Sequence, residues 1–209
     1  ENTMYEVLIT DSYDPKNAVR HTVVEGLDII PASVELAGAE VEMVQLEGRE
    51  KRLKRALDTI RDGYDYIFID FPPQNSLVTM MYLVASDYLI APLHLGKESS
   101  LFAYNDIIDC CEEAINSFDN KNLVRLGAFY TQTQLYKGYQ KEKYTESMTE
   151  EMRQAMRFFK TTIKYDYATT TAAEAYKEPV CISAGRSEIA KNYKAVSYTH
   201  LRAHETSQD

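Results

Sequence analysis

The sequence lacks tryptophan, has three cysteines among its 209 residues, and contains no long uninterrupted hydrophobic run. A membrane-spanning helix needs about 18 or more apolar residues in a row, so we predict no such helix and no membrane partner. Cys110 and Cys111 are adjacent, and Cys181 is isolated. This spacing does not match the CxxC pairs of zinc and redox sites, and it predicts reduced thiols, as in a cytosolic protein.

Glycine is sparse as well. A phosphate-binding P-loop has the pattern GxxxxGK[ST], because backbone N–H groups, a lysine and a hydroxyl must together hold phosphates and Mg²⁺. No two glycines of the chain have this spacing, so the chain contains no Walker A motif. The chain also opens at Glu1 without a methionine, and we expect it to be a piece of a longer protein.

Basic residues are outnumbered, with 23 Lys and Arg against 32 Asp and Glu, for a net charge of −9. This balance argues against a protein whose whole surface binds nucleic acid, although a local basic patch remains compatible with it. Hydrophobic residues make up 44% and charged residues 26% of the chain, which is typical of a globular protein rather than a disordered one.

Strand-like and helical patterns alternate along the chain. The predicted strands cover residues 27–31, 64–70, 88–93, 124–130 and 161–167. The predicted helices cover residues 37–45, 49–62, 77–85, 101–118 and 141–159. This alternation predicts an α/β fold with a parallel sheet and helices on both faces. In such sheets ligands bind beyond the carboxyl ends of the strands.

Asp70 ends the apolar run at residues 64–70 and is followed by Phe71, Pro72 and Pro73. A carboxylate at the carboxyl end of a buried strand can reach a Mg²⁺ ion or its bound water in a nucleotide site. The two prolines forbid a helix immediately after Asp70 and keep this segment extended. The structural alternative is an aspartate that ends a strand and caps a turn.

Three stretches of the sequence resemble a known family. They are Ile30-Pro31-Ala32-Ser33 with Leu36-Ala37-Gly38-Ala39-Glu40, then Gly48-Arg49-Glu50 with Arg52-Leu53 and Ala56-Leu57, then Tyr64 to Asp70 with Pro72-Pro73. Thr79, Ala85-Ser86-Asp87 and Pro92 continue the match. The pattern resembles the ParA/Soj family of deviant-Walker partitioning ATPases, which are related to MinD. The resemblance is specific from about residue 27 to residue 92 and continues more thinly to about residue 196.

The resemblance implies a three-layer α/β/α fold of the P-loop NTPase type, incomplete at the N-terminus and covering residues 1–196. By that resemblance Asp70 matches the catalytic Walker B aspartate and places Mg²⁺ through water. Pro72 and Pro73 match the switch II segment of the nucleotide site, and Thr131 lies where the family's loop approaches the base. The family's signature lysine and switch I aspartate would lie upstream of Glu1, so we expect this chain alone to be inactive.

The carboxyl-terminal half departs from the family pattern. Ile163-Lys164-Tyr165-Asp166 stands where relatives carry the base-binding Pro-Arg, and Arg186 is the one DNA-contacting arginine that is retained. Further basic residues could support contacts to phosphates, and the alternative is a solvated helix face with interspersed acids. Residues 197–209 resemble translated adapter DNA, so we expect a non-native tail and no metal site at His200 and His204.

The function that this resemblance implies is an ATPase of plasmid or chromosome partitioning. It would use ATP and Mg²⁺, dimerise on ATP, bind DNA non-specifically and respond to a ParB-like partner in the nucleoid-associated cytoplasm. A MinD-like or other deviant-Walker ATPase is one alternative. The other is a degenerate, non-hydrolysing DNA-binding or scaffold protein, which the missing Pro-Arg motif favours.

Overall fold

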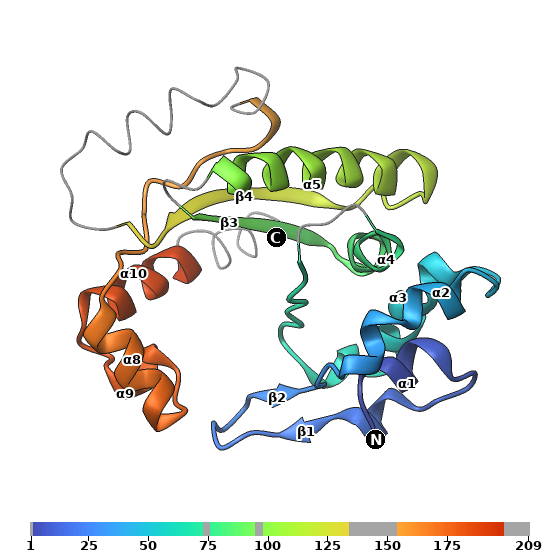
Figure 1. The fold of residues 1–209 in the computed structure, drawn as a ribbon, viewed down its shortest axis with the longest axis horizontal. Coiled ribbons are helices and arrows are strands. Elements are labelled where there is room, and N and C mark those ends of the chain that lie inside the picture. The colour runs from blue at the N-terminus through green and yellow to red at the C-terminus, as the bar shows by residue number, and fades with distance from the viewer. Residues whose placement is uncertain (1, 73–75, 95–97, 134–153, 199–209) are drawn as a thin grey trace. The chain divides into compact units, whose positions relative to one another are not determined.

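The computed structural model describes residues 2–72, 76–94, 98–133 and 154–198 (Figure 1). It divides into two compact units, one of residues 1–87 with 106–123 and one of residues 88–105 with 124–209. Over these described ranges, no helix has the length and apolar character that crossing a bilayer requires.

The first unit is mostly helical. Its α-helices are α1 (Met4–Ile9), α2 (Ala39–Met43), α3 (Arg52–Asp58) and α4 (Leu77–Ala85), with the second half of α5 (Glu98–Ser117). Its 3₁₀ turns are η1 (Pro15–Ala18), η2 (Val34–Ala37), η3 (Arg49–Lys51) and η4 (Arg61–Gly63). The predicted helix at 77–85 has the bounds of α4, and the predicted helices at 37–45 and 49–62 form as shorter helices joined to 3₁₀ turns.

Side chains from these short helices share one core. Its buried members are Leu8, Ala39, Met43, Leu53, Leu57, Ile60, Met81 and Tyr82. A capping box at Thr3 and Glu6 starts α1, since each side chain bonds the other residue's backbone N–H. Arg52 of α3 donates to the carbonyl oxygen of Leu8 at 2.6 Å, which ties α3 to α1. Packing thus stabilises helices that are too short to persist alone.

The predicted strand at 27–31 is found only in part, as β2 (Asp28–Ile29). It pairs antiparallel with β1 (Arg20–His21), so it belongs to a hairpin and not to a parallel sheet. The His21 ring nitrogen Nδ1 lies 2.7 Å from Asp28 Oδ1, directly across the two strands. Tyr64 also donates to Asp28, at 2.8 Å to Oδ2.

The predicted strand at 64–70 is wrong for this structure, because no strand is assigned there. Its apolar side chains are partly in water, with Tyr66 45%, Ile67 40% and Phe68 75% exposed. A strand requires the backbone ladder of a neighbouring strand, and an apolar run alone does not supply it. In the described part of the first unit, only β1 and β2 form such a ladder.

The second unit contains the parallel pair β3 (Tyr88–His94) and β4 (Val124–Thr131), which lie side by side in Figure 1. These are the strands predicted at 88–93 and 124–130. Leu89 pairs with Arg125 and Ile90 pairs with Gly127, so Leu126 is an extra residue that forms a bulge. α5, predicted at 101–118, follows β3 and precedes β4.

The chain returns beside β4 through residues 157–165. Phe158 forms a parallel bridge with Ala128, and Lys164 forms one with Thr133. Of the predicted strand at 161–167, only the bridge at Lys164 is found. The strand cannot continue to residue 167, because the Asp166 side chain accepts the backbone N–H of Thr169 and so caps α8 (Tyr167–Tyr176). Most of the predicted helix at 141–159 lies outside the described residues, and its end at Phe158 is extended.

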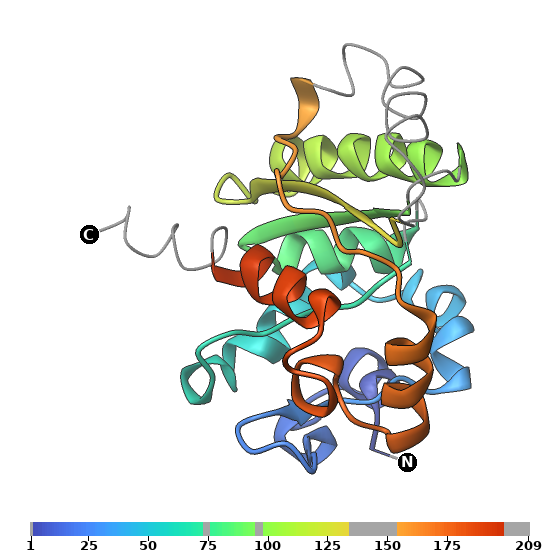
Figure 2. The same cartoon turned by 90° about the vertical axis from the view of Figure 1, so that its left-hand side faces the viewer.

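Three helices complete the second unit, in orange to red in Figure 2. α9 (Val180–Ser183) contacts both α8 and α10 (Glu188–Ser197). Ile189 and Val196 of α10 join a core with Leu126, Phe129, Phe159 and Ile163. Because Leu126 and Phe129 come from β4, this core fixes α10 against the strand that ends at Thr131.

Candidate functional site

Asp70 is exposed to solvent between two residues that face the core of the first unit. Ile69 and Phe71 are half-buried and pack against that core. The Phe71 ring lies 5.4 Å from the Tyr82 ring, centroid to centroid. In an extended segment successive side chains point in opposite directions, so anchoring Ile69 and Phe71 leaves the Asp70 carboxylate in water. Pro72 follows, also exposed.

Pro73 lies outside the described residues, and Ser76 is the N-cap residue of α4. Ser76 Oγ accepts the backbone N–H of Thr79 at 3.2 Å. Glu40 Oε1 accepts the backbone N–H of Val78 at 3.2 Å. Two oxygens thus satisfy backbone donors that a helix leaves unpaired at its first turn. The helix that follows the Asp70 segment begins at a firmly held position.

Sequence reasoning missed Glu40 as a site residue. It is half-buried on α2. Burial raises the pKa of the Tyr82 phenol, and the Glu40 charge raises it further. Glu40 is one of two acids, with Glu42, in the otherwise apolar Leu36-to-Met43 pattern, and nothing in the local sequence marks it as the one that bonds α4.

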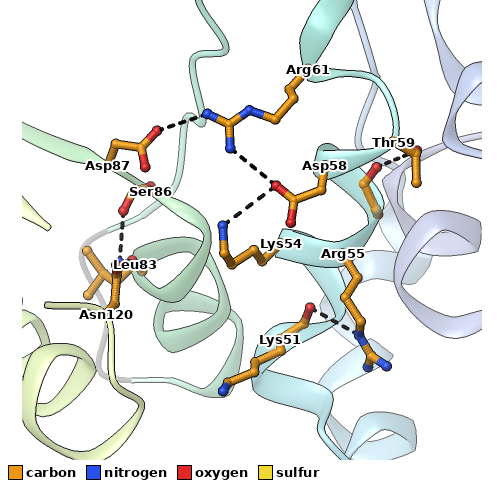
Figure 3. Close-up of polar contacts among 11 residues, drawn as sticks. Lys51, Lys54, Arg55, Asp58, Thr59, Arg61, Leu83, Ser86, Asp87 and Asn120 are labelled. Carbon is orange, nitrogen blue, oxygen red and sulfur yellow. Dashed lines mark hydrogen bonds and ion pairs between the residues drawn. The ribbon is translucent and has the colours of Figure 1, made fainter. Parts of the chain in front are cut away.

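The carboxyl end of α4 is held by a different set of polar contacts, shown in Figure 3. Asn120 Nδ2 donates to the carbonyl oxygens of Leu83 and Ser86, at 2.8 Å each. Asp87 follows Ser86, and its Oδ2 lies 3.8 Å from Nη2 of Arg61. Nη1 of the same guanidinium lies 3.3 Å from Asp58 Oδ1. These ion pairs are exposed and contribute little, roughly 0–1 kcal/mol each. Asn120 therefore provides most of the anchoring.

The described residues contain no group of three or more His, Cys, Asp or Glu side chains that could hold a metal ion. Asp70 therefore offers a single carboxylate, and the described residues around it do not form a complete set of metal ligands. Mg²⁺ typically binds through one or two carboxylates and takes its other oxygens from water and phosphates. An exposed single carboxylate fits that mode of binding. The sequence contains no P-loop to supply the phosphate cradle.

Thr131 is the last residue of β4, in the second unit. Its Oγ1 donates to the carbonyl oxygen of Leu93 at 3.3 Å, which joins the carboxyl ends of the two parallel strands. The hydroxyl oxygen keeps the capacity to accept a hydrogen bond from a ligand. Gln132 follows with a φ of 52°, so the chain turns sharply after Thr131.

Arg186 lies exposed in the turn between α9 and α10. Lys191 and Lys194 of α10 are exposed as well. Lys164, at the position of the family's missing Pro-Arg motif, forms an ion pair of 3.2 Å with Glu188. Among the predicted site residues, Asp70 and Pro72 belong to the first unit, and Thr131 and Arg186 belong to the second.

Comparisons with known proteins identify the family. The model of the AAA_31 family, described as an AAA domain, matches residues 1–124. The Bacillus subtilis sporulation initiation inhibitor protein Soj is 46% identical over 93 residues, 44% of this chain and 36% of that protein. The chromosome partitioning protein ParA of Myxococcus xanthus is 42% identical over 92 residues, 44% of this chain and 32% of that protein. The matched part thus spans about a third of these curated relatives.

A solved structure shows the same fold. It is cobyrinic acid a,c-diamide synthase from Mycobacterium smegmatis with a bound ATP analog and magnesium, 24% identical with a TM-score of 0.74. The match covers 99% of this chain and 74% of that one. This likeness confirms the predicted α/β fold of the P-loop NTPase type. The chain belongs to the AAA_31 family of AAA domains, as a relative of the Soj and ParA partitioning ATPases.

Proposed function

We propose that this chain forms the Walker B and DNA-contacting part of a ParA-type partitioning ATPase. The observation that carries the proposal is the position of Asp70. Its carboxylate faces solvent between the anchored Ile69 and Phe71, directly before the proline segment that leads to α4. The identity of 46% to Soj over 93 residues and of 42% to ParA over 92 residues supports a role of this kind.

In this proposal Asp70 accepts hydrogen bonds from Mg²⁺-bound water and so fixes the ion beside the nucleotide. The chemistry that Mg²⁺ would supply when bound is neutralisation of the negative charge that develops on the transferred phosphoryl group. Pro72 and Pro73 restrict the backbone after Asp70, which keeps its carboxylate at the anchored position. Thr131 offers its hydroxyl to the nucleotide base. A Walker A motif from elsewhere in the protein would hold the phosphates.

The DNA-binding part of the proposal rests on the second unit. Arg186, Lys191 and Lys194 are exposed cations on and beside α10, within an otherwise acidic chain. Contacts from such cations to DNA phosphates are independent of base sequence and weaken as salt rises. We extend the proposal to an ATP-dependent homodimer with a ParB-like partner, in the nucleoid-associated cytoplasm. Residues 1–196 would constitute its ATPase domain.

One observation favours a second candidate, a non-hydrolysing DNA-binding or scaffold protein. Tyr165 stands at the position of the family's base-binding arginine and Lys164 at that of the preceding proline, and the Lys164 ammonium group pairs with Glu188 at 3.2 Å. A tyrosine has no guanidinium group, and a lysine engaged in this way cannot replace the planar, bidentate contact of an arginine. Under this candidate the protein binds DNA whether or not nucleotide is present.

The test uses the longest natural reading frame that contains this chain. We expect it to bind non-specific duplex DNA with ATP and Mg²⁺ and much more weakly with ADP. Arg186→Ala should reduce the slope of log affinity against log salt by about one. The control is Lys121→Ala, an exposed lysine in the first unit that pairs with Asp119. Binding that ignores nucleotide would favour the scaffold, and the absence of DNA binding would contradict both candidates.

A further inference from the structure

A series of contacts joins the first turn of α4 to the Asp70 segment. Val78 and Tyr82 are four residues apart in α4, which places them one turn apart on the same side of the helix. Glu40 Oε1 of α2 accepts the backbone N–H of Val78 at 3.2 Å. The ring of Tyr82 lies 5.4 Å from the ring of Phe71, centroid to centroid. Since Phe71 follows Asp70 directly, α4 and Phe71 connect Glu40 to the Asp70 carboxylate.

The contact between α4 and Phe71 lies at the core of the first unit. Tyr82 is 6% exposed and belongs to that core, and Phe71 packs against it. The two rings are tilted by 49°, and aromatic pairs at such separations attract each other beyond the apolar area that they bury. Closely packed side chains transmit displacements to their neighbours. A shift of the Tyr82 ring would therefore move Phe71, and the Asp70 carboxylate beside it would move as well.

Glu40 differs from the other side chains that bond to the ends of α4. Ser76 is the N-cap of the same helix, so its bond to the first turn cannot fix α4 relative to its surroundings. Asn120 holds the opposite, carboxyl end of α4. Glu40 comes from a different helix, α2, in which Ala39 and Met43 are fully buried. It therefore ties the first turn of α4 to a firmly packed element.

We propose that Glu40 is a positioning residue for Asp70. By holding the first turn of α4 it keeps Tyr82 and Phe71 in place, and these two residues keep the Asp70 carboxylate where it can reach Mg²⁺-bound water. This inference rests on the proposed function of Asp70. A misplacement of about 1 Å at a reacting site can lower a rate about 100-fold, so a residue outside the site can act in this way. The alternative is a Glu40 that stabilises the fold without affecting the position of Asp70.

The first test needs neither nucleotide nor Mg²⁺. It measures urea unfolding of the longest natural reading frame for Glu40→Ala, Phe71→Leu and the double variant. We expect the combined loss of stability to be smaller than the sum of the single losses, because a loosened α4 has less ring contact left to lose. The control is Thr3→Ala, which removes the N-cap of α1 in the same unit, and its loss should add to that of Phe71→Leu. Additive losses for Glu40→Ala and Phe71→Leu would overturn the proposal.

The second test follows the ATPase rate of the same protein against Mg²⁺ concentration. Glu40→Ala should raise the Mg²⁺ concentration for half-maximal rate about threefold to tenfold. Glu40→Gln keeps an oxygen that accepts the Val78 N–H, so it should stay within about twofold of the wild type. Thr3→Ala should leave the Mg²⁺ dependence unchanged, and a shift equal to that of Glu40→Ala would overturn the proposal, because the shift would then follow stability alone.

Asp70→Asn, measured in parallel, separates this inference from the proposed function on which it rests. If Asp70→Asn loses turnover while Glu40→Ala leaves the Mg²⁺ dependence unchanged, the positioning role of Glu40 is wrong and the role of Asp70 stands. If Asp70→Asn keeps the wild-type rate, the proposed function itself is contradicted, and the positioning role fails with it.

Discussion

The Glu40 carboxylate of α2 accepts the backbone N–H of Val78 at 3.2 Å, across 38 residues of sequence. Val78 lies in the first turn of α4, where backbone donors have no partner within the helix. A negative charge at that end also interacts favourably with the helix dipole. The contact therefore fixes the start of the helix that follows the Asp70 segment.

Glu40→Ala should lower the free energy of unfolding of the first unit by about 1 kcal/mol, because the Val78 N–H loses its acceptor. Urea denaturation measures the change. The control is Glu47→Ala, an exposed glutamate in the loop after α2, which should change stability by less than about 0.5 kcal/mol. Equal losses for both variants would show that the contact with Val78 is not stabilising.

Gly127→Ala should be strongly destabilising in the second unit. Gly127 has a φ of 152°, and a Cβ atom there would lie 2.1 Å from Cε1 of Phe159 and 2.6 Å from the carbonyl oxygen of Arg157. Relieving this overlap would force the returning chain away from β4, at a cost of about 2 kcal/mol or more. Thermal denaturation provides the measurement.

The control for that substitution is Gly63→Ala. A Cβ at Gly63 would have no heavy atom within 4 Å. We expect a change within about 0.5 kcal/mol. If Gly127→Ala were as mild as this control, the close approach of Phe159 to β4 would be contradicted.

The Asp28 contacts predict a loss of stability in acid. The bond with His21 and then the bond from Tyr64 hold the pKa of the Asp28 carboxyl below its ordinary value. The unfolded pKa of an aspartate is about 3.9, so the stabilisation is complete above that pH. It is lost as the pH falls from there through the lower folded pKa.

Comparison of urea midpoints at about pH 6 and about pH 3 tests this linkage. The wild-type chain should lose more stability on acidification than Asp28→Asn, which has no carboxyl to protonate at that position. Asp62→Asn, at an exposed aspartate of η4, should behave as the wild type does. Equal acid sensitivity of the wild type and Asp28→Asn would contradict the prediction.

The 209-residue chain by itself should show no Mg-ATPase activity. Catalysis of phosphoryl transfer consists mostly of positioning and charge stabilisation, for which the backbone cradle and lysine of a P-loop are required. The sequence has no GxxxxGK[ST] pattern. Release of phosphate from ATP measures the activity, and turnover above that of a heat-denatured sample would contradict this prediction.

Local sequence was sufficient to predict a helix or strand where that element depends mainly on its own residues. The helical spacing at 77–85 predicted α4, and the apolar run at 124–130 predicted β4. The prediction of a strand at 64–70 was wrong, since a strand depends on a neighbouring strand that local sequence does not reveal. The contact between Glu40 and Val78 was missed for a similar reason, because its two residues are far apart in the sequence.

For the site itself, the family pattern located Asp70 but not the residues that hold it. The exposure of the Asp70 carboxylate follows from the packing of Ile69 and Phe71, which depends on α1 to α4 together. The anchoring of α4 by Asn120 was also not predicted, because the amide bonds to backbone carbonyls that no motif marks.

The most direct test of the proposed function is the ATPase rate of Asp70→Asn in the longest natural reading frame. Asp65→Asn, at an exposed aspartate in the same segment, is the matched control. We expect Asp70→Asn to lower turnover with Mg²⁺ by about 100-fold or more at unchanged stability, because the carboxylate that positions Mg²⁺ and its water is lost. The control should retain turnover near the wild-type rate. Wild-type turnover in Asp70→Asn would contradict the assignment of this segment as the Mg²⁺-nucleotide site.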